Sequence, residues 1–85
     1  MDQNYPNPFT QTTRISYYTE KPGRVELSVF NMLGQKVYSL VDEFQESGRH
    51  TVEFEAGSLP AGSYFYRLEA GKEFTMLKKM VLIKK

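Results

Sequence analysis

Strict alternation of polar and apolar residues runs through Arg24-Val25-Glu26-Leu27-Ser28-Val29, directly after the turn-forming Lys21-Pro22-Gly23. Successive side chains of a β-strand point to opposite faces, so this period of two predicts a strand that buries its three apolar residues. The strand therefore faces solvent on one side only.

Segments of the same kind flank this stretch. They span residues 12–18, 35–41, 50–55, 63–69 and 74–85, and glycine or proline stands at nearly every junction. Six short strands at close spacing, without clear helical periodicity, predict an all-β fold, an immunoglobulin-like antiparallel β-sandwich. In the most aromatic strand, Tyr64, Tyr66 and Leu68 occupy the predicted core face.

The connection between the second and third strands has turn chemistry. In Asn31-Met32-Leu33-Gly34, the glycine fits the positive-φ position that closes a short hairpin loop. Further on, Val37 and Leu40 cannot share one face under strict alternation, which predicts a β-bulge near Ser39.

The polar stretch 42–49 contains Gly48 and predicts a loop after the third strand. Phe44 is the large apolar residue inside this stretch. We expect it to fold back and cover the edge of the core.

Length, charge and composition exclude several classes of protein. The chain has 85 residues, which suit one small domain, and it has no cysteine for a disulfide or a cysteine-built metal site. A net charge of +1 is too balanced for the broad positive field that nucleic-acid binding needs. No apolar run approaches the ~20 residues of a transmembrane helix.

The start of the chain has its own composition. It carries neither the basic nor the apolar part of a signal peptide, so Met1 is interpreted as an initiator placed before an excised domain whose parent extends upstream. Two prolines in Asn4-Tyr5-Pro6-Asn7-Pro8-Phe9 restrict the backbone. Residues 1–11 are therefore predicted to be a proline-rich lead-in, and residues 12–85 the domain itself.

Catalysis needs a group of converging side chains, and the candidate residues do not form one. His50 is the single histidine and has no cysteine partner, so a structural or solvated role is favoured. Glu53 and Glu55 alternate outward along one strand and are interpreted as surface charge. The sequence thus predicts no catalytic, metal or cofactor site. Among the aromatic residues of the strands, mainly Phe65 is predicted to point away from the core, with Tyr18 or Tyr38 as further candidates for exposed side chains.

The last residues have an unusual pattern of four apolar side chains between two lysine pairs. The eight residues are Lys78, Lys79, Met80, Val81, Leu82, Ile83, Lys84 and Lys85. A structural interpretation is a terminal strand buried on both faces, whose lysines protect its exposed end against aggregation.

Four motifs, taken in order, resemble one known family. They are Tyr5-Pro6-Asn7-Pro8-Phe9, the run from Phe30 to Val37, the run from Leu59 to Leu68, and Lys78-Lys79-Met80-Val81-Leu82. Together they resemble the type A C-terminal sorting domain of the type IX secretion system, and the resemblance covers practically the whole chain. Flagellar hook-capping proteins contain a similar sandwich, so the fold alone does not define the function.

The resemblance implies a non-catalytic export signal at the C-terminus of a cargo protein. Such a cargo enters the periplasm by its own signal peptide, crosses the outer membrane through the type IX translocon, and loses the domain to a sortase-like peptidase at the cell surface. The recognised opening would fall on Asn7, Pro8 and Phe9. The supporting turn would fall on Gly34, and the terminal signal on residues 78–85.

One alternative remains open at this point. The domain could be an accessory binding module of a larger secreted protein, holding carbohydrate or another protein on its aromatic strand or its sheet edge. A binding module can lie anywhere in its parent protein, whereas a sorting domain must end it.

Overall fold

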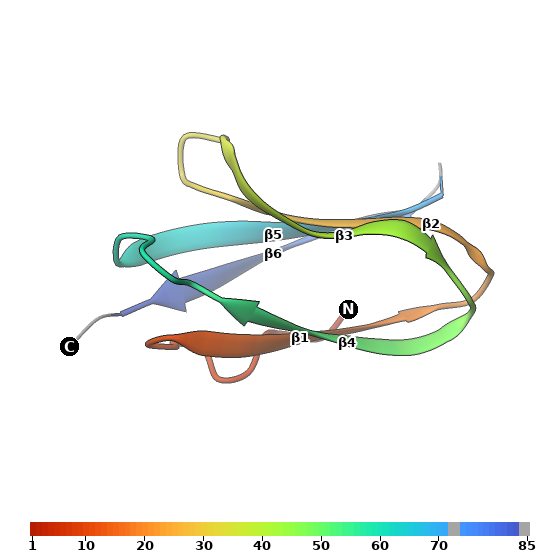
Figure 1. Cartoon of the computed structure of the whole chain (residues 1–85), viewed down its shortest axis with the longest axis horizontal. Coiled ribbons are helices and arrows are strands. Elements are labelled where there is room, and N and C mark those ends of the chain that lie inside the picture. Colours follow the sequence, from red (N-terminus) through yellow and green to blue (C-terminus); the bar gives the residue numbers. More distant parts are fainter. Residues whose placement is uncertain (72–73, 84–85) are drawn as a thin grey trace.

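The computed structural model describes residues 1–71 and 74–83. The described residues contain β1 (Thr12–Thr19), β2 (Gly23–Phe30), β3 (Lys36–Gln45), β4 (Gly48–Glu55), β5 (Gly62–Ala70) and β6 (Phe74–Leu82). They form a two-stranded sheet β1-β4 and a four-stranded sheet in the order β3-β2-β5-β6, and every strand pair is antiparallel. Figure 1 shows the two sheets as the two layers of a sandwich, which confirms the predicted fold class.

The core lies between the inner faces of the two sheets. Alternation predicted it correctly in β2, where Val25, Leu27 and Val29 are all buried. The β5 residues of the predicted core, Tyr64, Tyr66 and Leu68, are buried as well. In the described ranges, no helix is long and apolar enough to span a membrane.

One of the two irregularities in the β2–β3 pairing, and the turn between these strands, follow the sequence prediction. Leu27 pairs with Val41 and Ser28 with Ser39, so Leu40 is an extra residue in the ladder, next to the predicted bulge position. Gly34 has a φ of 82° in the β2–β3 hairpin, as expected for a residue that must adopt the left-handed conformation.

The loop predicted for residues 42–49 is wrong. Strand β3 continues to Gln45 and β4 begins at Gly48, so the two strands are joined by a very short connection. Phe44 pairs with Arg24 of β2 on the outer face, and its side chain is 61% exposed, so it does not cover the core. Polar residues on the solvent side of an edge strand resembled a loop in composition.

The burial predicted for the last strand is also wrong. β6 is an edge strand of the four-stranded sheet, with one face on the core and the other exposed. Met80 and Leu82 are buried, whereas Leu77 is 59% exposed. The predicted terminal residues Lys84 and Lys85 lie outside the described residues.

Candidate functional site

The N-terminal segment lies against both sheets. Its first part follows β1: Tyr5 N donates to Arg14 O over 2.9 Å, and Arg14 N donates to Tyr5 O over 2.8 Å. Asp2 N donates to Ser16 O, also over 2.9 Å. The residues predicted to be a lead-in thus extend the two-stranded sheet at the outer edge of β1.

The second part of this segment lies against the end of β6. Phe9 N donates to Val81 O (3.0 Å), and Ile83 N donates to Phe9 O (2.8 Å). The side chain of Asn7 accepts a hydrogen bond at Oδ1 from Val81 N (2.9 Å), although these residues are 74 positions apart. We call residues 7–9 together with residues 79–83 the terminal junction.

Phe9 connects the terminal junction to the core. Its side chain is 1% exposed, and its ring meets Phe54 edge-on with 6.1 Å between centroids. Asn7 and Pro8 remain exposed beside it. Of the three opening residues predicted as signal, one is therefore structural and two are accessible from solvent.

Tyr66 anchors the start of the N-terminal segment. This contact was not predicted from the sequence. Its hydroxyl accepts a hydrogen bond from Asn4 N (2.8 Å) and donates one to Asp2 O (3.1 Å). The side chain of Asn4 is buried and donates from Nδ2 to Thr13 Oγ1 (3.0 Å). A tyrosine on the inner face needs a partner for its hydroxyl, so Tyr66 was a signal that the core must contain polar groups.

The environment of Tyr66 also changes its acidity. Burial raises the pKa of the Tyr66 hydroxyl, because the phenolate would lose solvation. The hydrogen bond from Asn4 acts in the opposite direction, and the negative charge of Asp2 adds to the increase in pKa. The neutral hydroxyl that donates to Asp2 is therefore the stable form in the folded domain.

The predicted terminal signal is divided between two faces of β6. Met80 and Leu82 enter the core, whereas Lys79 and Val81 pair with Phe65 and Ser63 and share the outer face with them. Lys78 pairs with Tyr66 and is half-buried on the inner side of this edge strand. Inward-pointing charge on an edge strand discourages pairing with another chain.

The free edge of β6 is covered along its second half. In addition to the contacts of Asn7 and Phe9, the side chain of Gln3 donates from Nε2 to Lys79 O (2.8 Å). The N-terminal segment thus bonds to backbone groups of residues 79, 81 and 83. The structure brings the opening and closing motifs of the sequence into one place.

Gly34 lies in a separate element. The β2–β3 hairpin containing it is at the same end of the molecule as the end of β6 (Figure 1). Gly34 N donates to Asn31 O over 3.0 Å, and Asn31 Oδ1 accepts from the backbone of Leu33 and Gln35. The turn requires a glycine at position 34. The hydrogen bonds of this hairpin are all formed between residues of the hairpin itself.

His50 has a packing role on the opposite sheet. Its ring stacks on Tyr17 with 5.3 Å between centroids, and Nε2 lies 2.9 Å from Glu46 O. Burial raises the pKa of Tyr17, whose hydroxyl donates to Gln45 Oε1. Within residues 1–71 and 74–83, no three histidine or acidic side chains are grouped as metal ligands.

A family model described as a secretion system C-terminal sorting domain matches residues 3–84 of the chain. Comparisons with curated proteins and with solved structures gave no match. The matched range begins before Asn7 and extends past Ile83, so it includes both halves of the terminal junction and the hairpin between them.

Proposed function

Because this chain belongs to the family of secretion system C-terminal sorting domains, we propose that it is the export label of a larger cargo protein. It directs this cargo across the outer membrane through the type IX secretion system. A sortase-like peptidase then removes the domain at the cell surface. The domain is the substrate of both machines.

The terminal junction is the observation that supports this function beyond family membership. Hydrogen bonds between Asn7 or Phe9 and residues 81–83 hold the opening motif against the closing motif. A partner that binds the C-terminal end therefore also meets Asn7 and Pro8. We infer that the translocon recognises this combined surface, and that it requires the N-terminal segment to be correctly seated.

Residues 78–85 supply the remaining part of the proposed signal. Lys79 and Val81 are presented on the outer face, and Met80 and Leu82 hold the strand in place from the core side. Gly34 serves the signal indirectly, by keeping the adjacent hairpin in its turn conformation. The translocon then contacts the terminal lysines and the exposed part of the apolar quartet.

A reporter experiment tests this proposal. The 85 residues are fused behind a fluorescent protein with a periplasmic signal peptide, in strains with and without the translocon. We expect the reporter at the surface or in the medium in the first strain and in the periplasm in the second. Mass analysis of the exported reporter should show that the domain has been removed.

Deleting Lys84 and Lys85 separates the signal from the fold. Strand β6 ends at Leu82, before these two lysines, so the purified domain should unfold at nearly the same denaturant concentration without them. Export should nevertheless fail. Normal export of this variant would remove the two lysines from the signal, and normal export after deletion of residues 80–85 would contradict the sorting function.

A further inference from the structure

The β2–β3 hairpin projects beyond the outer face of the four-stranded sheet, as Figure 1 shows in yellow. Its loop, residues 31–35, carries Met32 and Leu33, whose side chains are 61% and 84% exposed. Beside the loop, the outer face presents Phe65 and the strongly exposed Leu77. We call this loop, together with the side chains beside it, the hairpin end of the outer face.

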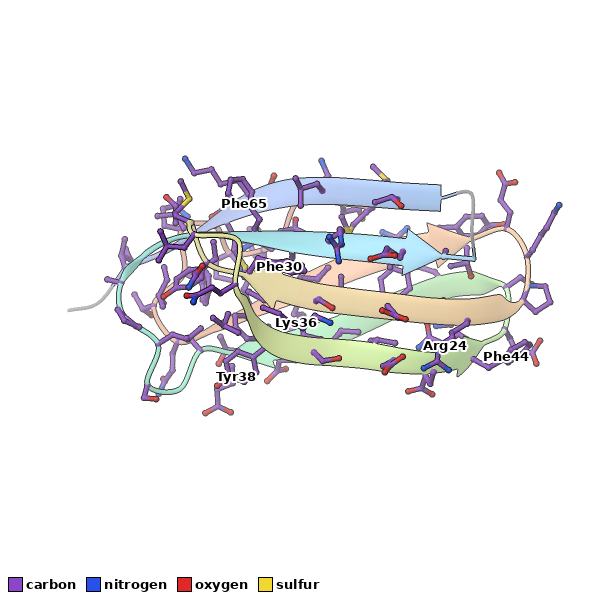
Figure 2. All side chains as sticks on the ribbon, turned by 90° about the horizontal axis from the view of Figure 1, so that it is seen from above. Arg24, Phe30, Lys36, Tyr38, Phe44 and Phe65 are labelled. Atoms are coloured by element: carbon purple, nitrogen blue, oxygen red, sulfur yellow. The ribbon has the colours of Figure 1, made fainter. Side chains whose placement is uncertain are left out.

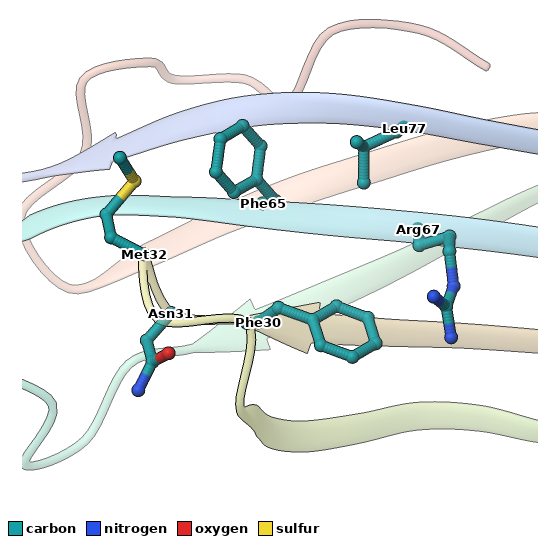
Figure 3. Close-up of a pocket in the computed structure, with 7 residues that line it drawn as sticks. Phe30, Asn31, Met32, Phe65, Arg67 and Leu77 are labelled. Atoms are coloured by element: carbon teal, nitrogen blue, oxygen red, sulfur yellow. The ribbon is translucent and has the colours of Figure 1, made fainter.

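The apolar groups of the hairpin end form one patch. Figure 3 shows Phe30, Met32, Phe65 and Leu77 around a hollow of about 240 Å³. A single exposed apolar residue is common in soluble domains, whereas a contiguous exposed patch marks an interaction site. The guanidinium carbon of Arg67 lies 4.5 Å above the centre of the Phe30 ring, and the hollow is smaller than the ~300–1,000 Å³ of ordinary small-molecule sites. The patch therefore fits an extended surface better than a small molecule.

The polar groups of the loop are bonded within the loop itself. Gly34 N donates to Asn31 O over 3.0 Å, and Asn31 N donates to Gln35 O over 2.9 Å. The side chain of Asn31 accepts from Leu33 N and Gln35 N, and it donates from Nδ2 to Gln35 Oε1. Four of the five loop amides thus have a partner inside the loop. A loop that enters lipid must satisfy its own donors, because hydrocarbon offers them no acceptor.

Two lysines flank the apolar patch on the same face. Lys36 of β3 pairs with Phe30, and Lys79 of β6 pairs with Phe65, which places both lysines on the outer face. Figure 2 shows Lys36 beside Phe30 at this end. In the described part of the chain, neither lysine forms an ion pair. Their strands are about 14 Å apart, since neighbouring strands are separated by ~4.8 Å, so positive charge stands on both sides of the patch.

The acidic residues of the outer face lie away from the hairpin end. Glu26 pairs with Asp42 on one side and with Glu69 on the other, so the three form one row across the sheet. Four residues of β2, about 13 Å, separate this row from Phe30. Each of the three carboxylates forms an ion pair with an arginine of the same face. The unbalanced charge at the hairpin end is therefore positive.

We propose that the hairpin end binds the surface of an anionic lipid bilayer. Met32 and Leu33 enter the boundary between headgroups and acyl chains, and Lys36 and Lys79 reach the phosphate groups around them. A lysine suits this position, because its apolar stem lies along apolar surface while the ammonium group stays in the polar layer. This inference is independent of the export function.

A lipid surface matches these features better than a folded partner does. A folded partner would need a cleft for the projecting loop and carboxylates at fixed positions beside the two lysines. Lipids close around an inserted loop, and their headgroups move freely, so the lysines meet phosphate without a fixed register. The negative potential of an anionic bilayer attracts each basic residue near its surface. The bonded amides of the loop also need no partner there.

The charge distribution determines the orientation of the domain on the bilayer. Glu53 and Glu55 are exposed on the two-stranded sheet, on the side of the sandwich opposite the projecting hairpin (Figure 1). The row that contains Glu26 lies further along the outer face, where a flat contact would press carboxylates onto anionic lipid. The domain therefore touches the bilayer with the hairpin first, and the rest of the outer face is inclined away from it.

Vesicle flotation with the purified domain tests the proposal. One myristoyl chain binds a bilayer with only about 10⁴ M⁻¹, and two side chains bury less apolar surface, so millimolar lipid is needed. We expect the domain to float with vesicles of phosphatidylcholine that contain roughly one third phosphatidylglycerol. Binding should be much weaker to phosphatidylcholine alone, and high salt should reduce it by screening the lysines.

Tryptophan fluorescence locates the contact, because the chain has no tryptophan of its own. Leu33→Trp places a single indole at the tip of the loop, and its emission should move to shorter wavelength when anionic vesicles are added. Phe44→Trp is the matched control, because Phe44 is 61% exposed on the same face but lies at the end opposite Phe30 (Figure 2). Its emission should stay unchanged.

Two further variants separate the apolar contribution from the charge. Leu33→Ser should weaken binding to anionic vesicles by about tenfold, as for the loss of one inserted leucine, while circular dichroism verifies that the sheet is retained. Lys36→Gln should weaken it by about fivefold. Lys21→Gln is its matched control, because it changes the net charge equally in the exposed β1–β2 turn at the other end of the molecule, and it should bind like wild type.

Several results would overturn the lipid contact. They are a wild-type domain that does not float with anionic vesicles, an equal emission shift in the Leu33→Trp and Phe44→Trp variants, or equal weakening by Lys36→Gln and Lys21→Gln. A domain that ignores vesicles, but whose Leu33→Ser variant is no longer exported in the reporter strain, would instead assign the hairpin end to a protein partner.

Discussion

The terminal junction and the hairpin end of the outer face lie at the same end of the sandwich, yet they are built in opposite ways. Backbone hydrogen bonds and the buried ring of Phe9 hold the junction together. The hairpin end instead exposes Met32, Leu33 and Leu77 around Phe65. Loss of a buried side chain in the junction should therefore lower the stability of the fold, whereas loss of an exposed side chain on the outer face should affect folding little.

The largest expected effect comes from Phe9→Ala. The ring is buried against Phe54, so its loss should lower the free energy of unfolding by about 3–5 kcal/mol. Chemical denaturation of the purified domain measures this. Phe44→Ala is the matched control at an exposed phenylalanine and should stay within about 0.5 kcal/mol of wild type. Equal losses of unfolding free energy in the two variants would contradict the contrast between the buried junction and the exposed outer face.

Tyr66→Phe should have the second largest effect. It keeps the ring but leaves the buried Asn4 N without its acceptor, at a cost of about 1–3 kcal/mol. Hydrogen exchange should then become faster in residues 2–9 than in β2, because the N-terminal segment loses its anchor. Uniform acceleration over the whole domain would show that the segment does not open separately.

The pH dependence of stability follows from the same hydroxyl. Folding raises the pKa of Tyr66 and of Tyr17 above the usual value of about 10, so the folded state holds these protons more tightly. The contribution of these two hydroxyls to the free energy of unfolding should be constant below about pH 10, and the free energy should fall as the pH rises through the raised pKa values. The slope above pH 10 should be smaller in Tyr66→Phe, and an identical slope would exclude Tyr66 as a contributor.

Gly34→Val tests the hairpin. Its φ of 82° lies in the left-handed region, where a β-branched residue is strained, so a loss of about 1–2 kcal/mol is expected. Gly34→Asn is the control, because asparagine tolerates this conformation. The space around the glycine is open, so the backbone alone should produce the difference, and equal thermal unfolding of the two variants would contradict it.

Local patterns were enough to predict the parts of the fold that depend on neighbouring residues. The period of two identified the buried face of β2. The bulge was located because Val37 and Leu40 cannot share one face of a regularly alternating strand. The same reasoning failed for Phe44, because an edge strand that faces solvent has the composition of a loop. It failed for β6 because burial on both faces depends on the strand order, which composition does not contain.

The sequence identified which residues form the candidate site, but it did not show which of them contact each other. The resemblance identified Asn7 to Phe9 and residues 78–85, yet nothing local shows that Asn7 Oδ1 accepts from Val81 N. A pairing over 74 positions depends on the arrangement of both sheets. Gln3 and Asn4 were missed for the same reason, since their partners are Lys79 and Tyr66.

Apart from the Phe44→Ala control, the smallest expected effect on stability belongs to Asn7→Ala, and it distinguishes the two regions most sharply. The side chain is exposed, and its single bond to Val81 N is worth about 0.5–1.5 kcal/mol at most. The Val81 amide should nevertheless lose its protection from hydrogen exchange, because Asn7 Oδ1 is its acceptor at the edge of β6. Asn7→Asp keeps the acceptor and should keep the protection.

If the junction acts as one recognised surface, export of the reporter should fall in Asn7→Ala and recover in Asn7→Asp, while Phe44→Ala is exported normally. Equal export of Asn7→Ala and wild type would mean that the end of β6 is recognised without the segment that covers it.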